Sequence, residues 1–338
     1  MKNKILILGG TGFIGFNIAK VLSKSSDNLI HIADNLSRGK KDAEIDSLLL
    51  QKNVKLIEGD FTDRETFNLL DDNYNNVYML ASVVGVNNTL QKPHEIIRIN
   101  SLLILNTLSW LSESTVKKVI FTSTSENYAG TIDQFNYTIP TPEEVPLCIS
   151  DISHPRYTYA VTKILGESAF LNYSKVYGFE CCIIRYHNVY GPRMGFKHVI
   201  PHLVERFRSG ENPFLIYGAE QTRAFCFIDD AVEGTILAMS NPSSDGEIFH
   251  IGTSEEISIR DLVTFTDSHF NYNGEYENAA TFPGSTQRRC PDINKAKKIL
   301  GYKPKISWKN GLIETLNWYN QFFELNKSTF ESSFEKPF

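Results

Sequence analysis

The sequence carries little excess charge, and this narrows the partners it can have. Of 338 residues, 34 are lysine or arginine and 39 are aspartate or glutamate, so the formal net charge is −5 at pH 7. Chains that bind nucleic acid usually show a basic excess gathered along one helix or face. We therefore expect no nucleic-acid partner.

Long apolar runs are missing as well. A membrane-spanning helix needs roughly 18–20 consecutive apolar residues, and the sequence contains no such run. The opening segment MKNKILILGGTGF has a charged start and a short apolar stretch, which superficially resembles a signal peptide. Because this stretch runs directly into glycines without a small-residue cleavage site, we interpret it as a strand and predict no membrane association.

Cysteine and histidine occur in no pattern typical of a metal site or a disulfide framework. The five cysteines form no CxxC pair, and their number is odd. None of the eight histidines is paired with a cysteine or a carboxylate at metal-ligand spacing. We therefore predict no metal, reduced and packed thiols, and a cytoplasmic location.

The first two-thirds of the chain contains six short runs rich in Ile, Val, Leu, Phe and Tyr, separated by longer helical patterns. The runs are 4–8, 28–34, 54–60, 76–82, 117–124 and 179–186. Because they are continuously apolar rather than alternating, we expect strands buried on both faces of a parallel α/β sheet. Two of the helical patterns, 96–112 and 158–178, are long enough for crossover helices, and Gly178 is suited to end the second.

The regular alternation ends near residue 186, after which shorter elements follow until a last helix near 309–325. We therefore predict a large sheet domain and a smaller C-terminal lobe, with a polar tail at the periphery. The predicted sheet domain is 1–186 with 224–242 returning to it, the lobe is 187–223 with 243–325, and the tail is 326–338.

The turn after the first strand has the composition of a phosphate-binding loop. In GGTGFIG, Gly9, Gly12 and Gly15 form a GxxGxxG arrangement that opens a helix. Glycines at this spacing permit a tight turn and a close approach of backbone to a pyrophosphate at the helix N-terminus. Asp34 ends the second strand, where a carboxylate accepts hydrogen bonds from ribose hydroxyls and repels a 2′-phosphate. We therefore predict NAD as the cofactor. NADP is the alternative cofactor, because the cationic side chain of Arg38 follows closely.

Two further positions fit a dinucleotide. Asp60 ends the third strand in GDF and can meet an adenine, and Ala81 ends the fourth with a side chain small enough to leave room for the cofactor. Each carboxylate has the alternative role of a helix cap or turn former. The complete predicted cofactor site is Gly9, Gly12, Phe13, Ile14, Gly15, Asp34, Asn35, Asp60, Phe61, Ala81, Tyr159 and Lys163.

The segment YAVTK places Tyr159 and Lys163 four residues apart, and thus on one face of a helix. A phenol with a pKa of about 10 is a poor base at neutral pH. A nearby ammonium stabilises the phenolate, which then accepts a proton from a sugar hydroxyl. The alternative for an isolated YxxxK pattern is a solvated helix face.

With these motifs in place, the chain resembles the extended short-chain dehydrogenase/reductase family, in particular its nucleotide-sugar epimerases, dehydratases and decarboxylases. The resemblance extends from residue 4 to about 302. The segments that carry it are GGTGFIG, DNLSRG, GDF, MLAS, FTSTSENYAG, YAVTK, RYHNVYGPR, QTRAF and RRCPDINKAKKILGY. It implies a Rossmann-type doubly wound parallel sheet that binds NAD, a smaller C-terminal substrate-binding lobe, and a homodimer paired through two helices, for which 96–112 and 158–178 are the candidates.

The resemblance also implies roles for individual residues. Thr124 matches a hydroxyl that binds the sugar, Tyr159 the base, and Lys163 the residue that binds nicotinamide ribose and tunes the tyrosine. The residues that match contacts to the diphosphate of a nucleotide-sugar substrate are Asn188, Arg223 and Arg289, with Arg193 as a further candidate. Guanidinium groups suit a diphosphate, and a surface ion pair is the alternative for the arginines.

Glu126, in Thr124-Ser125-Glu126, has two interpretations: a turn acid, or a catalytic acid–base group. Similar segments in relatives carry an acid in sugar 4,6-dehydratases and glucuronate decarboxylases, and none in simple 4-epimerases. After oxidation at C4, a carboxylate here would move the C5 proton. NYAG, where VYG is commoner, leaves the shape of the adjacent pocket open.

The predicted function is therefore oxidation of a nucleotide sugar at C4 by an enzyme of the 4-epimerase, 4,6-dehydratase or 4-dehydrogenase type. A nucleotide-uronate decarboxylase is the alternative, although residues 83–88 offer no arginine for a substrate carboxylate. An alternative of another class is a catalytically idle dinucleotide-binding sensor or scaffold. The intact set of Thr124, Tyr159 and Lys163 argues against it.

Overall fold

A parallel sheet of seven strands forms the centre of the protein. The computed structural model describes residues 2–37, 41–196, 198–281 and 285–326. The strands are β1 (Asn3–Leu8), β2 (Asn28–Asp34), β3 (Val54–Glu58), β4 (Asn76–Met79), β5 (Lys118–Thr124), β6 (Glu180–Tyr186) and β11 (Ile248–Ile251). Their order is β11-β6-β5-β4-β1-β2-β3, and the sheet and all six predicted strands are confirmed.

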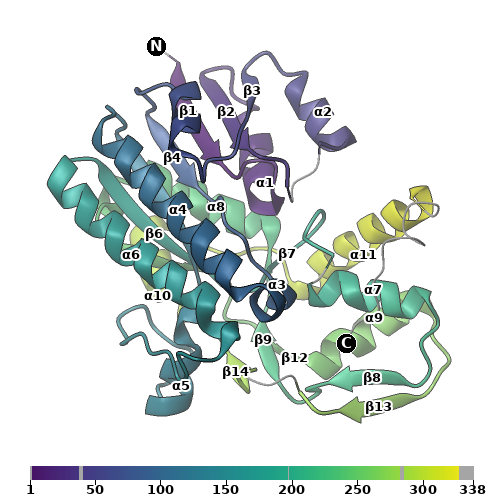
Figure 1. Ribbon diagram of the computed structural model, residues 1–338. Helices are drawn as coiled ribbons and strands as arrows, with labels where there is room; N and C mark the ends of the chain where they lie inside the picture. The colour runs from purple at the N-terminus through teal and green to yellow at the C-terminus, as the bar shows by residue number, and fades with distance from the viewer. Residues whose placement is uncertain (1, 38–40, 197, 282–284, 327–338) are drawn as a thin grey trace.

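Helices cover both faces of this sheet, which explains why its strands are apolar throughout. On one face of the sheet, Leu6 and Leu8 of β1 pack in an apolar cluster with residues of α4 (Pro93–Ser112). On the other face, Ile5 and Ile7 pack in a second cluster with residues of α1 (Phe13–Leu22). Side chains alternate between the faces of a strand, so both faces must be apolar when both are covered. In Figure 1, α4 lies beside α6 (Thr158–Tyr177) in front of the sheet.

The C-terminal part of the chain forms a smaller lobe of short strands and helices at one end of the sheet (Figure 1). Its helices are α7 (Val199–Arg208), α9 (Ile259–Phe270) and α11 (Trp308–Leu325), and its strands are β8 (Phe214–Tyr217), β9 (Thr222–Ala224), β12 (Glu256–Ser258), β13 (Tyr276–Ala279) and β14 (Arg288–Arg289). The remaining elements are α2 (Ala43–Leu49), α3 (Val86–Gln91), α5 (Ala129–Phe135), β7 (Val189–Tyr190), β10 (Cys226–Phe227), α8 (Ile228–Ser240) and α10 (Asn294–Leu300).

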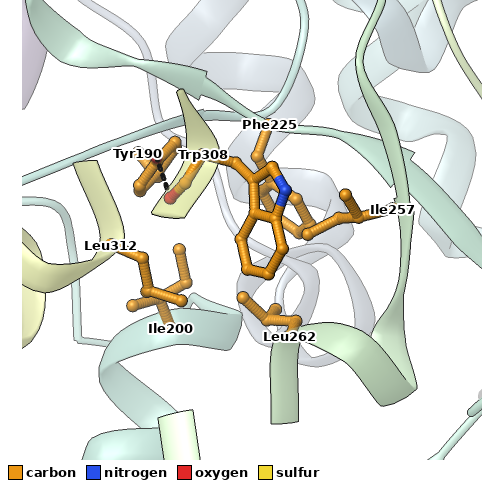
Figure 2. A pocket seen from close by; sticks show the side chains of 7 residues that line it. All are labelled: Tyr190, Ile200, Phe225, Ile257, Leu262, Trp308 and Leu312. Carbon is orange, nitrogen blue, oxygen red and sulfur yellow. Dashed lines mark hydrogen bonds between the residues drawn. The ribbon is translucent and has the colours of Figure 1, made fainter. Parts of the chain in front are cut away.

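Apolar side chains from four elements of the lobe converge on Trp308. Figure 2 shows the ring surrounded by Phe225, Ile257 and Leu262, with Ile200 and Leu312 nearby. The Tyr190 hydroxyl donates a hydrogen bond of 2.9 Å to the Trp308 carbonyl. The start of α11 is thereby tied to β7.

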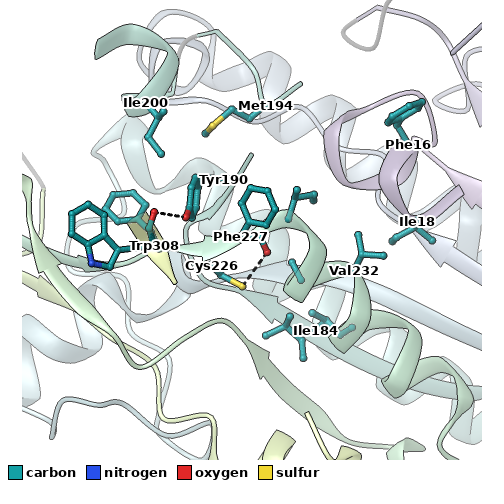
Figure 3. Packing of buried hydrophobic residues seen from close by; sticks show 14 of the residues in the cluster. Phe16, Ile18, Ile184, Tyr190, Met194, Ile200, Cys226, Phe227, Val232 and Trp308 are labelled. Carbon is teal, nitrogen blue, oxygen red and sulfur yellow. Dashed lines mark hydrogen bonds between the residues drawn. The ribbon is translucent and has the colours of Figure 1, made fainter. Parts of the chain in front are cut away.

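One apolar cluster connects this lobe to the sheet. Figure 3 follows it from Phe16 on α1, through Val232 on α8, to Tyr190 and Trp308. The chain returns to the sheet twice: α8 packs against α1, and β11, which comes after the predicted 224–242 segment, pairs with β6. The proposed division into domains remains a prediction, and its tail from residue 327 onward lies outside the described residues.

No helix in the described part of the chain combines the length and hydropathy that crossing a membrane requires. All five cysteines are unpaired. Four of them are buried, and Cys148 is partly exposed.

Candidate active site

The glycine loop after β1 is packed so closely that side chains would not fit. Gly9 has φ +81°, and a Cβ there would lie 2.6 Å from the Ala81 nitrogen. A Cβ on Gly15 would lie 2.5 Å from the Gly9 carbonyl oxygen. Gly12 precedes α1 and offers no side-chain cap to its first amides. These residues fit a dinucleotide, because the loop consists of backbone without bulky side chains and leads into the positive N-terminal end of α1.

Asp34 lies beside this loop at the carboxyl end of β2. Its two oxygens accept hydrogen bonds from the Thr11 amide (3.1 Å) and the Leu36 amide (2.9 Å). A carboxylate in this place repels a 2′-phosphate, as NAD selectivity requires. Asn35 beside it is exposed. Arg38, which favoured the NADP alternative, lies outside the described residues.

Asp60 also comes after a strand of the sheet, but its contacts are local. Its Oδ1 accepts from the Thr62 amide (3.0 Å) and hydroxyl (2.8 Å), as expected of a turn former. The side chain is exposed, whereas Phe61 next to it is buried. Asp60 therefore lies just after β3, where its carboxylate already stabilises a turn.

Tyr159 and Lys163 lie on the face of α6 that meets β5. The Lys163 ammonium donates to the Thr122 carbonyl (2.8 Å) and lies 5.7 Å from the centroid of the Tyr159 ring. Lys163 is 3% exposed, and burial lowers the pKa of this amine to about 7, although the charge of Glu167 acts to raise it. The predicted tyrosine–lysine pair is thus directed toward the end of the fifth strand.

Thr124 is the last residue of β5 and caps the turn after it. Its Oγ1 accepts a hydrogen bond of 3.2 Å from the Glu126 amide. An oxygen that accepts in this way keeps its own proton available for donation. Thr124 thus ends β5 with its hydroxyl at the turn, and its role in binding the sugar remains a prediction.

Glu126 is paired with Arg289 across 163 positions of sequence. Arg289 Nη1 lies 2.6 Å from Glu126 Oε1, and the two side chains are 7% and 33% exposed. Burial acts to raise the pKa of Glu126, but the charges of Arg289, Arg156 and Arg223 together hold that pKa below its ordinary value. Glu126 is therefore an ionised carboxylate at neutral pH.

The charges of three arginines act on Glu126. Glu256 also acts on Arg223 but is itself paired with Arg288, so positive charge exceeds negative charge at the site. Burial, followed by the charge of Arg289, lowers the pKa of Arg223 to about 10. Arg289 Nε is buried and has no hydrogen-bond partner within the ranges that the structure describes. Such a group is normally satisfied by a ligand or water. The cluster therefore favours an anionic ligand.

Arg156 is a further residue of the site that no sequence motif singled out, although it lies only three residues before Tyr159 in PRYTY. It belongs to a short 3₁₀ turn, Pro155–Tyr157, that leads into α6, and its charge acts on Glu126. The sequence provided one signal, its closeness to Tyr159, but nothing in the pattern indicated that the charge of Arg156 acts on Glu126.

Two other predicted contacts have different surroundings. Asn188 has φ +40°, and its amide donates to the Ala224 carbonyl on β9 (3.2 Å), next to Arg223. Arg193, by contrast, forms ion pairs with Asp42 (2.5 Å) and Glu44 (3.4 Å). Arg193 thus joins the segment after β7 to α2, whereas Asn188 lies toward the arginine cluster.

No group of three or more histidine, cysteine, aspartate or glutamate side chains within the described ranges is arranged to hold a metal ion.

A glycine loop at the first strand of a doubly wound sheet, together with a tyrosine–lysine helix packed on the fifth strand, defines a dinucleotide-dependent enzyme with a Rossmann-type fold. The model of the NAD dependent epimerase/dehydratase family matches residues 5–252. The chain belongs to this family, and it is an NAD-dependent enzyme.

Individual relatives agree with this assignment. The chain is 33% identical to a UDP-N-acetyl-alpha-D-glucosaminuronate decarboxylase of Bacillus cytotoxicus, over 95% of this chain and 99% of the relative. The UDP-glucuronic acid 4-epimerase of Bacillus cereus, solved with UDP-glucuronic acid and NAD, has a TM-score of 0.83 at 26% identity, with 94% and 99% of the two chains covered. The UDP-glucose 4-epimerase of Thermotoga maritima, solved with UDP-glucose, has a TM-score of 0.82 at 29% identity, with 95% and 99% covered.

Proposed function

We propose that this enzyme oxidises the sugar of a nucleotide-diphosphate sugar at C4. NAD, when bound against the glycine loop, supplies the hydride acceptor. The observation that carries the proposal is the buried Lys163 ammonium beneath Tyr159, at the end of the strand that terminates in Thr124. The named activities of the relatives support the substrate class.

Each of these residues has a distinct task. Tyr159 accepts the proton of the C4 hydroxyl as the C–H bond breaks, and Lys163 stabilises the phenolate by its charge. Thr124 donates its hydroxyl proton to the sugar, since its oxygen already accepts from the Glu126 amide. An idle sensor would gain nothing from burying Lys163, because burial disfavours the charged form of the amine.

The diphosphate is bound by the cationic cluster. Arg156, Arg223 and Arg289 outweigh the one charge of Glu126, which suits a ligand with two negative charges. The unpartnered Nε of Arg289 and the position of Asn188 beside β9 support contacts from both sides. The nucleotide is thereby anchored while the sugar reaches Tyr159.

Mass spectrometry of the products from a panel of nucleotide sugars, with uronates and heptoses included, tests this function. We expect at least one member to yield a 4-epimer, a dehydrated or decarboxylated sugar, or a 4-keto sugar with reduced cofactor. A panel without any C4 oxidation would contradict the proposal and favour a binding protein.

Glu126 governs the chemistry after C4 has been oxidised. Because it is ionised, it is suited to remove the C5 proton, which the new C4 ketone acidifies. We expect Glu126→Gln to leave C4 oxidation within about tenfold of wild type and to reduce the C5 step by about 10²–10⁴-fold, the usual contribution of a general base. Deuterium incorporation at C5 in heavy water, monitored by mass spectrometry, measures this step.

The matched control is Glu256→Gln, which removes a carboxylate paired with Arg288 on the same strand as Arg289. We expect it to leave the C5 exchange unchanged. If wild-type protein oxidises C4 without any C5 exchange, Glu126 has only a structural role, in the turn and in the ion pair with Arg289.

The arginine cluster also favours decarboxylation of a nucleotide uronate as a second candidate. Residues 83–88 contain no arginine, but Arg156 supplies a cation near Glu126 that can hold a substrate carboxylate. The relative from Bacillus cytotoxicus is named for this reaction on an N-acetylated uronate. With UDP-glucuronic acid as the probe, release of carbon dioxide would favour the decarboxylase, whereas a product of unchanged mass would favour the epimerase.

We further propose a homodimer paired through α4 and α6. These helices pack together, and each presents exposed apolar side chains: Ile97, Leu105, Val161 and Leu165, which are 39–48% exposed. We expect Val161→Glu with Leu165→Glu to convert the dimer to a monomer in analytical ultracentrifugation, since two buried charges per subunit would be unpaired. Leu50→Glu, at a side chain 84% exposed on another face, should not change the mass, and a dimer that survives the first pair would place the interface elsewhere.

A cytoplasmic location is likewise proposed. It is supported by the five cysteines, all of which are unpaired. Protein in an oxidising compartment normally pairs its thiols.

A further inference from the structure

A buried carboxylate, Glu167, lies one helical turn beyond Lys163 on α6. Glu167 is 4% exposed and forms a bidentate ion pair with Arg185 on β6, with Oε1 2.8 Å from Nε and Oε2 2.6 Å from Nη2. Charged side chains are rarely buried this deeply unless they are paired. The pair therefore lies one helical turn behind the tyrosine–lysine site.

Glu167 holds both sides of the turn that carries Thr124 and Glu126. Its Oε1 accepts from the Ser123 hydroxyl (2.5 Å), just before Thr124, and from the Asn127 amide (2.9 Å), just after Glu126. Asn127 also donates to the Ser123 oxygen (3.1 Å), which closes the triangle. This explains Asn127 in NYAG, because a valine there could not donate to the carboxylate.

The same carboxylate acts on Lys163. The Lys163 ammonium faces the Thr122 carbonyl and the Phe121 ring on β5, and the Tyr159 ring and Glu167 on its own helix. Burial disfavours its charged form, and the charge of Glu167 favours it.

Arg185 lies on the other side of Glu167 and stabilises the ionised carboxylate. A planar guanidinium that donates two parallel hydrogen bonds is the strongest partner for a carboxylate. Arg185 is itself fixed, since it also donates to the Tyr128 hydroxyl and to the Glu143 carbonyl (3.1 Å). Tyr128 in turn is hydrogen-bonded to His250 (2.7 Å).

We propose that Glu167 is a positioning residue for the reaction, which favours the ammonium form of Lys163 from the next turn of α6 and holds the Thr124–Glu126 turn against α6. The inference rests on the proposed function, because it assigns a role within the same site. Glu167 touches neither substrate nor cofactor in this role and acts through Lys163, Ser123 and Asn127. The structure thus adds Glu167 to the groups that act on the base. Lys163 acts on Tyr159 directly, and Glu167 acts on Lys163.

The test is the pH profile of kcat for the holoenzyme, with the nucleotide sugar that the product panel identifies. Activity falls at high pH when Lys163 loses its proton. Without Glu167 the ammonium is less stable, so the basic limb should move to lower pH by about one unit, as expected for loss of one nearby opposite charge. The variant is Glu167→Gln combined with Arg185→Met, which leaves neither charge stranded in the core.

Three comparisons separate positioning from a purely structural role. Glu167→Asp keeps the charge, and we expect its basic limb to stay within a few tenths of a unit of wild type. Ser123→Ala removes one hydrogen bond to Glu167 and should leave the basic limb in place while it lowers kcat. Thermal unfolding reports the stability of each variant separately.

The outcomes are distinct. A basic limb that moves in the double variant and returns in Glu167→Asp supports the proposal. A double variant with a lower melting temperature and an unmoved limb would overturn it and leave the ion pair a structural feature. Absence of any C4 oxidation by wild-type enzyme would instead contradict the proposed function, and this is known before a variant is made.

Discussion

Replacement of Tyr159 by phenylalanine is expected to reduce C4 oxidation by about 10²–10⁴-fold, the usual contribution of a positioned general base. The variant lacks only the phenol oxygen, so Lys163 keeps its hydrogen bond to the Thr122 carbonyl and the helix keeps its packing. Bound cofactor should therefore be retained while its reduction is lost. Single-turnover absorbance of NADH, with the nucleotide sugar found in the product panel, measures the effect.

Tyr177→Phe is the matched control for this prediction. Tyr177 lies at the end of the same helix, α6, and is 52% exposed. We expect its rate to equal that of wild type. Turnover of the Tyr159→Phe enzyme at the wild-type rate would refute the role of Tyr159, and would favour a site in which another group accepts the proton.

Replacement of Arg185 alone by methionine is expected to cost about 3–5 kcal/mol of unfolding free energy. The change removes both hydrogen bonds to Glu167 and leaves a buried carboxylate without its guanidinium. Urea unfolding of the variant and of wild type, monitored by circular dichroism, measures this loss.

Arg208→Met provides a comparison at the surface. Arg208 lies 2.6 Å from Glu324, the same distance as Arg185 from Glu167, but the side chains are 26% and 52% exposed. An exposed ion pair contributes only about 0–1 kcal/mol, because water solvates both charges when the pair is broken. Equal losses for the two variants would mean that burial of Glu167 does not set the cost.

The sequence is more informative about the cofactor end of the predicted site than about the substrate end. The glycine loop, Asp34 and the tyrosine–lysine pair obey local spacing rules, and the structure has them at the strand ends and helix face that those rules require. Glu126 was assigned two possible roles, and sequence could not choose between them. Its neighbour Arg289 was predicted to contact a diphosphate, with no indication that the two side chains meet.

Arg289 reaches Glu126 only because β14 pairs with β9 in register. Arg289 is opposite Arg223 in this pairing, and both extend toward the turn after β5. These strands are only two and three residues long, too short to leave a clear pattern of alternation. Arg156 was missed for a related reason, since the orientation of its turn depends on where α6 docks against the sheet.

Sequence by itself determined the fold class and predicted the dinucleotide end and the tyrosine–lysine helix. Each was inferred from short motifs, within which the backbone geometry of a strand, turn or helix dictates which side chains share a face. The tertiary structure alone decided which charges meet. It joined Glu126 to Arg289 across 163 positions and placed Glu167 and Arg185 behind Lys163. Such contacts depend on the packing of whole elements, and electrostatic energies vary steeply with distance and burial, which spacing along a chain does not specify.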